Sequence, residues 1–269
     1  MRRDHRSSRR DVLQLGLTGI AAGLVPGLAC APTTTATARA SSPQAVAPPL
    51  APRAEPCTLP LPPGLSADDR ALLGSPGDAL AVVQRTPGQD GVLRHLAREL
   101  SRADADQLDR FEARMRASLT ASNHGVGLAA PQIGIGARAI VVMLGARTDS
   151  PRVEFYVNPR IVQRSDDVTL DYEGCLSVPD ICGLVRRNRS VVIEHGMPEG
   201  TTRRVEATGF DARIFQHEID HLDGVLYIDR VEGGLQPKER LKELREQLRK
   251  EHPELAMATR ASEDRPAVL

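Results

Sequence analysis

Hydrophobic and polar positions alternate with two different periods along this chain. Within residues 103–122 the apolar side chains recur every three or four positions, which predicts an amphipathic helix: Leu108, Phe111, Met115 and Leu119. Residues 139–144 form a β-branched apolar run and predict a buried strand. Residues 153–157 alternate and stop at Asn158-Pro159, which is typical of a strand ending in a turn. Shorter strands are predicted at residues 161–162, 168–170, 184–185, 190–193 and 202–205.

Two further helices are predicted after these strands. Apolar residues at positions 212, 214, 215, 219 and 222 share one stripe, with Thr208 or Asp211 as the N-cap and Gly224 as the C-terminal stop. Residues 237–250 are charged with a leucine period, which indicates a C-terminal helix on the outside of the domain. This order predicts an α+β fold, with small mixed or antiparallel sheets around the helix of residues 211–222.

The two ends of the chain lack these patterns. Five arginines precede an apolar, Gly-rich run from Val12 to Ala29, as in an export signal, and residues 8–13 resemble a twin-arginine signal. Residues 28–30 resemble a lipoprotein box, so Cys30 is a candidate membrane tether; without use of this signal we expect a cytoplasmic protein. We therefore expect a signal-like segment at 1–30, a disordered Ala/Pro/Thr linker at 31–64, one folded domain at 65–251 and a disordered tail at 252–269.

Composition excludes one class of partner. The 269 residues are 41% hydrophobic, which is enough for a core, and that core must be aliphatic because there are no Trp, four Phe and three Tyr. The formal net charge is zero and no basic run occurs beyond the N-terminus, so nothing indicates nucleic-acid binding.

The strongest chemical signal is the pair His217 and His221, with Glu218 beside the first histidine. Four residues apart on a helix, the two imidazoles face one side and can bind one metal ion, while Glu218 can move a proton of a water molecule. A metal site needs a third ligand. In one family of zinc peptidases it would be a histidine at position 227, which is Tyr227 here, so a zinc metallopeptidase would need a downstream carboxylate: Glu239, Glu243 or Glu246.

Two other stretches carry candidate chemistry. Residues 125–136 are rich in glycine, but they lack the Gly-Lys-Ser/Thr of a phosphate loop and lie between a helix and a strand. Their glycines allow close backbone approach, and Gln132 can donate a hydrogen bond to a developing oxyanion. Cys175 has three open roles: a buried apolar filler, a nucleophile paired with histidine, or the third metal ligand.

In this order, residues 125–132, 173–177 and 216–224 resemble the three signature motifs of the peptide deformylases. The resemblance extends over roughly residues 77–251 and implies hydrolysis of the N-formyl group from the N-terminal methionine of new polypeptides. It implies Cys175, His217 and His221 as metal ligands and Glu218 as the general acid/base. Metal-bound hydroxide would attack the formyl carbon. The resemblance favours Fe(II) as the metal, with Zn(II) as the other candidate.

The same resemblance implies how the substrate binds. Gln132 and the backbone N–H of Leu176 would bind the formyl oxygen. Val126, Gly127 and Glu173 would line the methionine pocket and the edge on which N-formylmethionyl peptides or nascent chains dock.

Two features depart from the family pattern. The export-like N-terminus keeps a second function open, an exported metal-binding lipoprotein with diverged or lost activity. Cys182 replaces a basic residue of many relatives, and in an exported protein it could form a disulfide with Cys57.

Overall fold

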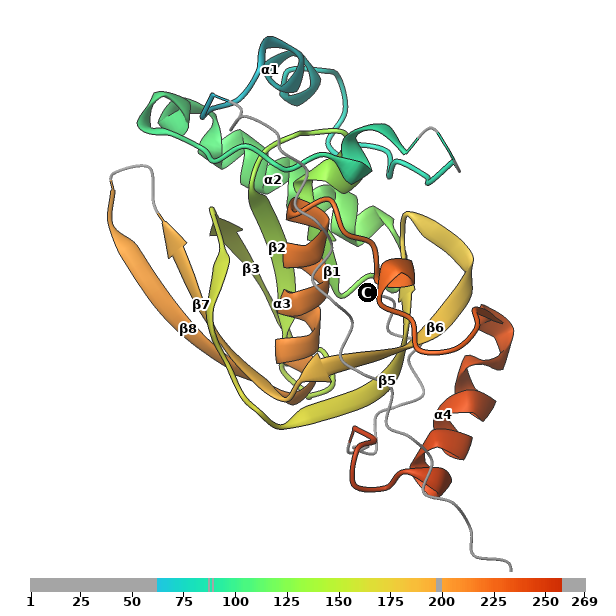
Figure 1. Cartoon of the computed structure of the whole chain (residues 1–269). Coiled ribbons are helices and arrows are strands. Elements are labelled where there is room, and N and C mark those ends of the chain that lie inside the picture. The colour runs from blue at the N-terminus through green and yellow to red at the C-terminus, as the bar shows by residue number, and fades with distance from the viewer. Residues whose placement is uncertain (1–61, 87, 89, 197–199, 258–269) are drawn as a thin grey trace, which may run out of the picture. The chain divides into compact units, whose positions relative to one another are not determined.

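The structure, a computed structural model, describes residues 62–257 except 87, 89 and 197–199 (Figure 1). Its helices are α1 (Ala67–Leu73), α2 (Leu108–Ala121), α3 (Gly209–Leu222) and α4 (Leu241–Glu251). Its strands are β1 (Gly127–Ala129), β2 (Ala139–Leu144), β3 (Arg152–Val157), β4 (Arg160–Arg164), β5 (Val168–Cys175), β6 (Val178–Asn188), β7 (Ser190–Gly196), β8 (Thr202–Thr208) and β9 (Gln236–Pro237). Short 3-10 helices lie at Gly91–Arg94, Arg102–Gln107, Ala130–Ile133, Tyr227–Asp229 and Lys238–Arg240. Within the described residues, no helix has the length and apolar character to cross a membrane.

The strands form three small sheets, in the orders β1-β2-β3, β4-β7-β8 and β5-β6-β9. Every strand pair within these sheets is antiparallel. The predicted α+β class is confirmed, with antiparallel rather than mixed sheets. The strand after residue 177 is much longer than predicted, since β6 spans eleven residues where the sequence indicates only 184–185.

Strand β2 lies between two helices and is buried on both faces, as its apolar run predicts. Ile140 and Val142 belong to the core cluster of α3, while Ala139 and Val141 belong to the core cluster of α2. Because side chains alternate across a strand, one run of six residues supports both cores. Helix α3 is central to the domain (Figure 1), and twelve of its 14 residues are buried.

The predicted N-cap and C-terminal stop of α3 can be compared with the structure at the two ends of the helix. Thr208 is the N-cap but makes no side-chain cap hydrogen bond, and the Asp211 carboxylate accepts from the Gly145 backbone N–H at 3.1 Å instead. Gly224 follows the helix with φ +70°, as a C-terminal stop should. A Cβ at this position would lie 2.5 Å from the Arg94 carbonyl oxygen, so a side chain is excluded by space as well.

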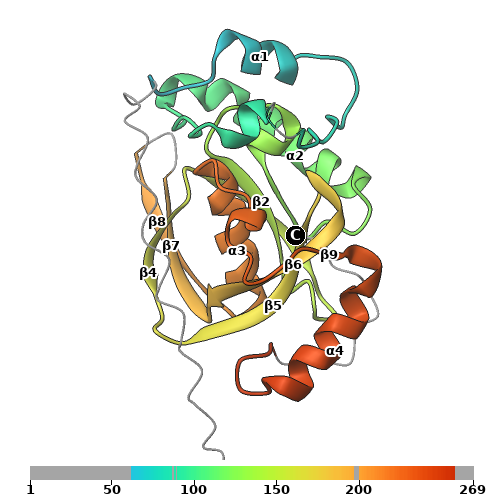
Figure 2. The same ribbon diagram turned by 45° about the vertical axis from the view of Figure 1, so that its right-hand side comes forward.

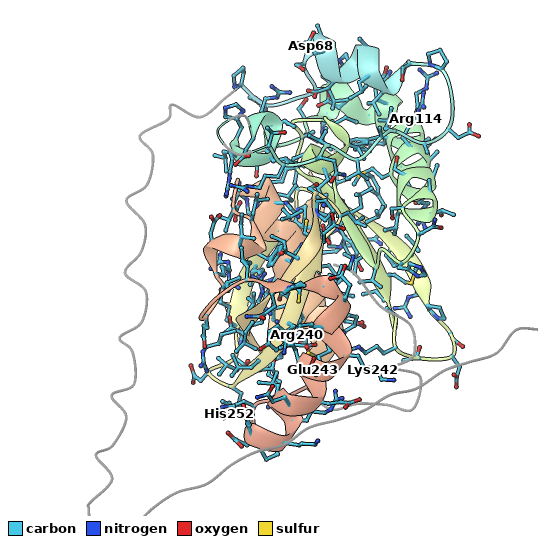
Figure 3. All side chains as sticks on the ribbon, turned by 90° about the vertical axis from the view of Figure 1, so that its right-hand side faces the viewer. Asp68, Arg114, Arg240, Lys242, Glu243 and His252 are labelled. Carbon is cyan, nitrogen blue, oxygen red and sulfur yellow. The ribbon has the colours of Figure 1, made fainter. Side chains whose placement is uncertain are left out.

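Helix α1 precedes the predicted start of regular structure and has a capping box. Ser66 donates its backbone N–H to Asp69 Oδ2 at 2.8 Å, and the Asp69 N–H returns to Ser66 Oγ at 3.1 Å. Asp69 also accepts from the Gly136 N–H at 2.9 Å and pairs with Arg98, and Leu73 joins the core of α2. These contacts dock α1 onto the rest of the domain, at the end opposite to α4, as the labelled Asp68 and His252 show (Figure 3).

Helix α4 lies alongside β5 and β6 (Figure 2) and buries Leu241, Leu244 and Leu248. The sequence predicts a disordered tail from residue 252, and the structure describes the first six residues of that segment, 252–257. The Leu255 carbonyl accepts from the Leu170 N–H at 2.9 Å, and Met257 is only 8% exposed. The predicted signal and residues 31–61 of the predicted linker, with Cys30 and Cys57, lie outside the described residues. The last three linker positions, 62–64, are described, and the Gly64 N–H donates to the Glu99 carbonyl at 2.7 Å.

Candidate metal centre and active site

The end of β5 and one face of α3 bring Cys175, His217 and His221 together, although the cysteine and the histidines are far apart in sequence. Their ligand atoms lie within 4.8 Å of one another, and all three side chains are buried. Cys175 Sγ is 3.2 Å from His221 Nε2, and the two imidazole rings have centroids 5.0 Å apart. The i, i+4 spacing places both rings on the same side of the helix, as predicted.

The donor atoms fit a divalent metal ion. His217 Nδ1 lies 3.0 Å from Glu173 Oε2, and this carboxylate fixes the hydrogen on Nδ1. The other nitrogen, Nε2, is buried and has no hydrogen-bond partner in the described part of the chain. Two imidazoles and one thiolate form a three-ligand set with a position left for water, and these ligand types suit Zn(II) or Fe(II).

Protonation favours the ligand role of Cys175 over the nucleophile role. Burial raises the pKa of the Cys175 thiol to about 12, and the charge of Glu218 adds to the effect. Burial and the neighbouring His217 hold the pKa of His221 well below its ordinary value. A thiolate–imidazolium pair is therefore disfavoured, whereas a bound cation would stabilise the thiolate and needs His221 neutral.

Glu218 is poised beside the three ligands. Its side chain is 0% exposed, and neither carboxylate oxygen has a hydrogen-bond partner among residues 62–257. Burial and then the negative charge of Glu173 raise its pKa well above the ordinary value. The Gly127 backbone lies against the Glu218 carboxylate. A Cβ at position 127 would collide with this carboxylate and lie 2.8 Å from Ile214 Cγ2. The glycine-rich segment thus allows β1 to approach α3 closely, which is the close-approach role expected for it.

Gln132 lies in the 3-10 turn between β1 and β2, and its amide has a defined orientation. Its Oε1 accepts from the Ala129 N–H at 2.8 Å, so its Nε2 points towards Cys175 Sγ at 3.4 Å and Ser177 Oγ at 3.3 Å. Leu176 is between those two residues, in the turn from β5 to β6. The structure thus brings a side-chain N–H donor and the Leu176 segment to the three candidate metal ligands.

Glu173, expected on a docking edge, has a fully buried side chain in contact with the candidate ligand His217. Besides His217, its carboxylate accepts two hydrogen bonds from Arg187, at 3.0 and 2.8 Å, and one from Arg213 at 2.6 Å. Burial alone would raise its pKa, but Arg187, His217 and Arg213 outweigh burial and hold the pKa well below the ordinary value. A charged Glu173 therefore orients the His217 ring.

The network around Glu173 continues outward. Arg187 Nη1 lies 2.5 Å from Asp220 Oδ2, and Asp220 also pairs with Arg230 at 2.6 Å. The sequence patterns predict no role for Arg187, Arg213 or Asp220. One available signal was helix position, since Arg213 precedes His217 by four residues and Asp220 follows it by three, and charges inside a buried helix need partners.

Tyr227 occupies the position at which a zinc peptidase of the longer pattern would carry its third histidine. Its ring stacks on His217, with centroids 6.1 Å apart and planes at 21°, and its hydroxyl donates to the Ile181 carbonyl at 3.1 Å. Within the described residues, the one group of three potential ligands is that of Cys175 and the two histidines. The downstream glutamates are not part of it.

Two further residues that the sequence analysis named, Val126 and Cys182, are buried in the described chain. Val126 is buried in the same core cluster as Phe210 and Ile214 of α3. Cys182 is a buried free thiol whose Sγ is 3.8 Å from the Pro237 carbonyl oxygen. Its predicted partner, Cys57, is outside the described residues.

Comparison with known proteins gives consistent similarities. A family model described as polypeptide deformylase matches residues 83–236. The peptide deformylase of Heliobacterium modesticaldum is 44% identical over 154 residues, which are 57% of this chain and 97% of that protein. Peptide deformylase 2 of Gloeobacter violaceus is 42% identical over 146 residues, which are 54% of this chain and 77% of that protein.

The fold has similar solved structures. The Met-ala-ser bound crystal structure of class I type b peptide deformylase from Acinetobacter baumannii superposes with a TM-score of 0.51 at 35% identity, covering 57% of this chain and 98% of that chain. The family match contains all three motifs of the site, whereas α1, α4 and residues 252–257 lie outside residues 83–236.

Proposed function

The chain belongs to the polypeptide deformylase family, and from this premise we propose that it hydrolyses the N-formyl group from the N-terminal methionine of newly made polypeptides. The proposal assigns Cys175, His217 and His221 as ligands of one divalent metal ion. The observation that carries it is the convergence of these three buried ligand atoms within 4.8 Å, beside a carboxylate without a hydrogen-bond partner in the described chain.

When bound, the metal supplies Lewis acidity, which lowers the pKa of water from 15.7 towards about 7 and polarises a carbonyl group. The other steps belong to side chains of this protein. Glu218 accepts the proton that the attacking water loses, and returns it to the amine nitrogen as the formyl C–N bond breaks, so that the products are formate and a free N-terminus. Its burial between β1 and α3 supports this role, because neither carboxylate oxygen is engaged in a hydrogen bond with another described residue.

Gln132 and the Leu176 backbone N–H are proposed to donate to the formyl oxygen as it gains negative charge. The hydrogen bond from Ala129 to Gln132 Oε1 supports this assignment, since it aims the amide nitrogen at the ligand cluster. Glu173 is proposed to hold His217 in the tautomer that leaves Nε2 free for the metal.

For the substrate, we propose that Val126 and Gly127 line the pocket for the methionine side chain. The apolar cluster that Val126 shares with Ile214 and the close approach of Gly127 to α3 support this. The related structure from Acinetobacter baumannii holds Met-ala-ser, which supports a peptide that begins with methionine as the ligand. Fe(II) is proposed as the metal in the cell, with Zn(II) as the alternative, and metal analysis of anaerobically purified protein tests this choice.

Export by the twin-arginine route and anchoring through Cys30 stay predictions from the sequence. Cell fractionation of the natural protein and of the Cys30→Ala variant would test the tether, since the variant should leave the membrane fraction.

The chemistry is tested with the full-length protein and formyl-Met-Ala-Ser, by measuring the free amine released and the bound metal in parallel. We expect Glu218→Gln to retain the metal and lose about 10²–10⁴-fold in kcat. Glu239→Gln, an exposed carboxylate of the type a zinc peptidase would need, is the matched control and should retain full activity. Full activity in Glu218→Gln, or full metal content in Cys175→Ala, would contradict the assignment.

A further inference from the structure

Arg213 is a buried cation that contacts the metal centre through Glu173. It lies on α3 four residues before His217 and is 1% exposed. A guanidinium has five N–H donors, and each needs an acceptor when the group is buried. Nη1 donates to Glu173 Oε1 at 2.6 Å and to the Val185 carbonyl at 3.0 Å. Nη2 donates to the carbonyl and hydroxyl oxygens of Thr169, at 3.0 and 3.1 Å.

The fifth donor, Nε, has an unusual acceptor. It lies 3.3 Å from the thioether sulfur of Met257, so all five N–H groups of Arg213 are used. Met257 belongs to the segment after α4, which lies outside the family match. That segment is held in place where the Leu170 N–H donates to the Leu255 carbonyl at 2.9 Å, directly after Thr169.

We propose that Met257 is a positioning residue for the metal centre, acting through Arg213 and Glu173 on the ligand His217. This inference rests on the metal site of the proposed function. A sulfur acceptor completes the hydrogen bonding of Arg213, Arg213 holds the Glu173 carboxylate, and that carboxylate orients the His217 ring. Loss of the acceptor leaves the buried Nε–H of Arg213 without a hydrogen bond. The guanidinium then shifts, and its hydrogen bond to Glu173 weakens.

The test compares two methionines that differ in this contact. Met257→Leu retains apolar volume but removes the sulfur. Met115→Leu is the matched control, because Met115 is fully buried in the separate core cluster of α2. Each full-length variant is assayed for Zn²⁺ affinity by chelator competition, for the absorption spectrum of the Co²⁺ form and for unfolding in urea. Met257→Gln, whose amide oxygen can accept the same N–H, tests for rescue.

We expect Met257→Leu to weaken Zn²⁺ binding about 10-fold and to alter the Co²⁺ spectrum. A 10-fold loss is the lower end of the 10–100-fold range for substitution of residues that hydrogen-bond to metal ligands. Met115→Leu should match the natural protein in both, and Met257→Gln should recover most of the affinity. Equal Zn²⁺ affinity in Met257→Leu and the natural protein overturns the inference, as does a Gln variant as weak as the Leu variant. If the natural protein binds no Zn²⁺ at all, the proposed function itself fails, which is a different result.

Discussion

Replacing Glu173 by glutamine retains the shape of this side chain but removes its negative charge and one acceptor oxygen. In the structure both oxygens are used, by two hydrogen bonds from Arg187, one from Arg213 and the contact with His217. Two guanidiniums would then share a buried site with less negative charge, and one amide N–H would face donors. Removal of one partner from a buried ion pair costs about 3–5 kcal/mol, which would lower the urea midpoint by about 2 M.

The matched control is a more exposed ion pair, whose arginine, Arg186, directly precedes Arg187 on β6. Glu232 accepts from Arg186 at 2.7 and 3.1 Å, but the Glu232 side chain is 38% exposed. Glu232→Gln should therefore cost no more than about 1 kcal/mol. Urea unfolding of metal-free protein measures both variants, and chelator competition then measures Zn²⁺ affinity, which we expect Glu173→Gln to lower by about 10–100-fold.

Two results would refute this reasoning. If Glu173→Gln loses no more stability than Glu232→Gln, the buried network does not contribute as the structure indicates. If stability falls but Zn²⁺ affinity is unchanged, Glu173 supports the fold without orienting His217.

Three other predictions concern separate parts of the molecule. Gln132→Leu should retain the metal and lose about 10²–10³-fold in kcat on formyl-Met-Ala-Ser, and an unchanged kcat would exclude the oxyanion role. Asp69→Asn should lower the free energy of unfolding by about 2–3 kcal/mol and leave kcat/KM unchanged, because the carboxylate that docks α1 loses its pairing with Arg98. If urea unfolding shows no loss of free energy in this variant, the docking of α1 adds no stability. Burial raises the pKa of Asp171, but three guanidiniums outweigh it and hold the pKa below its usual value: Arg245, Arg213 and Arg147. The stabilisation by charged Asp171 is complete above the unfolded pKa of about 3.9 and is lost as the pH falls through the folded pKa. The difference in unfolding free energy between the natural protein and Asp171→Asn should therefore be largest near pH 7 and shrink below about pH 4. A difference that does not depend on pH would contradict this prediction.

The elements with a strong local pattern are those that the sequence predicts well. The buried strand at 139–144 follows from an unbroken apolar run, and the helix that carries the two histidines follows from a period of 3.6 residues; both signals depend only on near neighbours in the chain. The spacing of His217 and His221 belongs to this class, because one helical turn suffices to bring the two rings together. The Gly224 stop is equally local.

Features with a weak local pattern escaped prediction. Helix α1 spans only seven residues, and its capping box and the contacts of Asp69 with Gly136 and Arg98 stabilise it. The segment of residues 252–257 is only six residues long and has no apolar period, and a hydrogen bond to β5 and burial of Met257 hold it against the domain. Neither feature has a period long enough to be read from the chain alone.

The sequence by itself determined which residues have the chemistry of a metal hydrolase and, through their resemblance to three motifs, which of them belong to one site. Only the tertiary structure decided what surrounds them. Glu173 contacts residues 14, 40 and 44 positions away, at Arg187, Arg213 and His217, and Met257 is 44 positions from Arg213. Such pairs have no local signature, because a buried charge is satisfied by whichever partner the packed strands and helices bring to it.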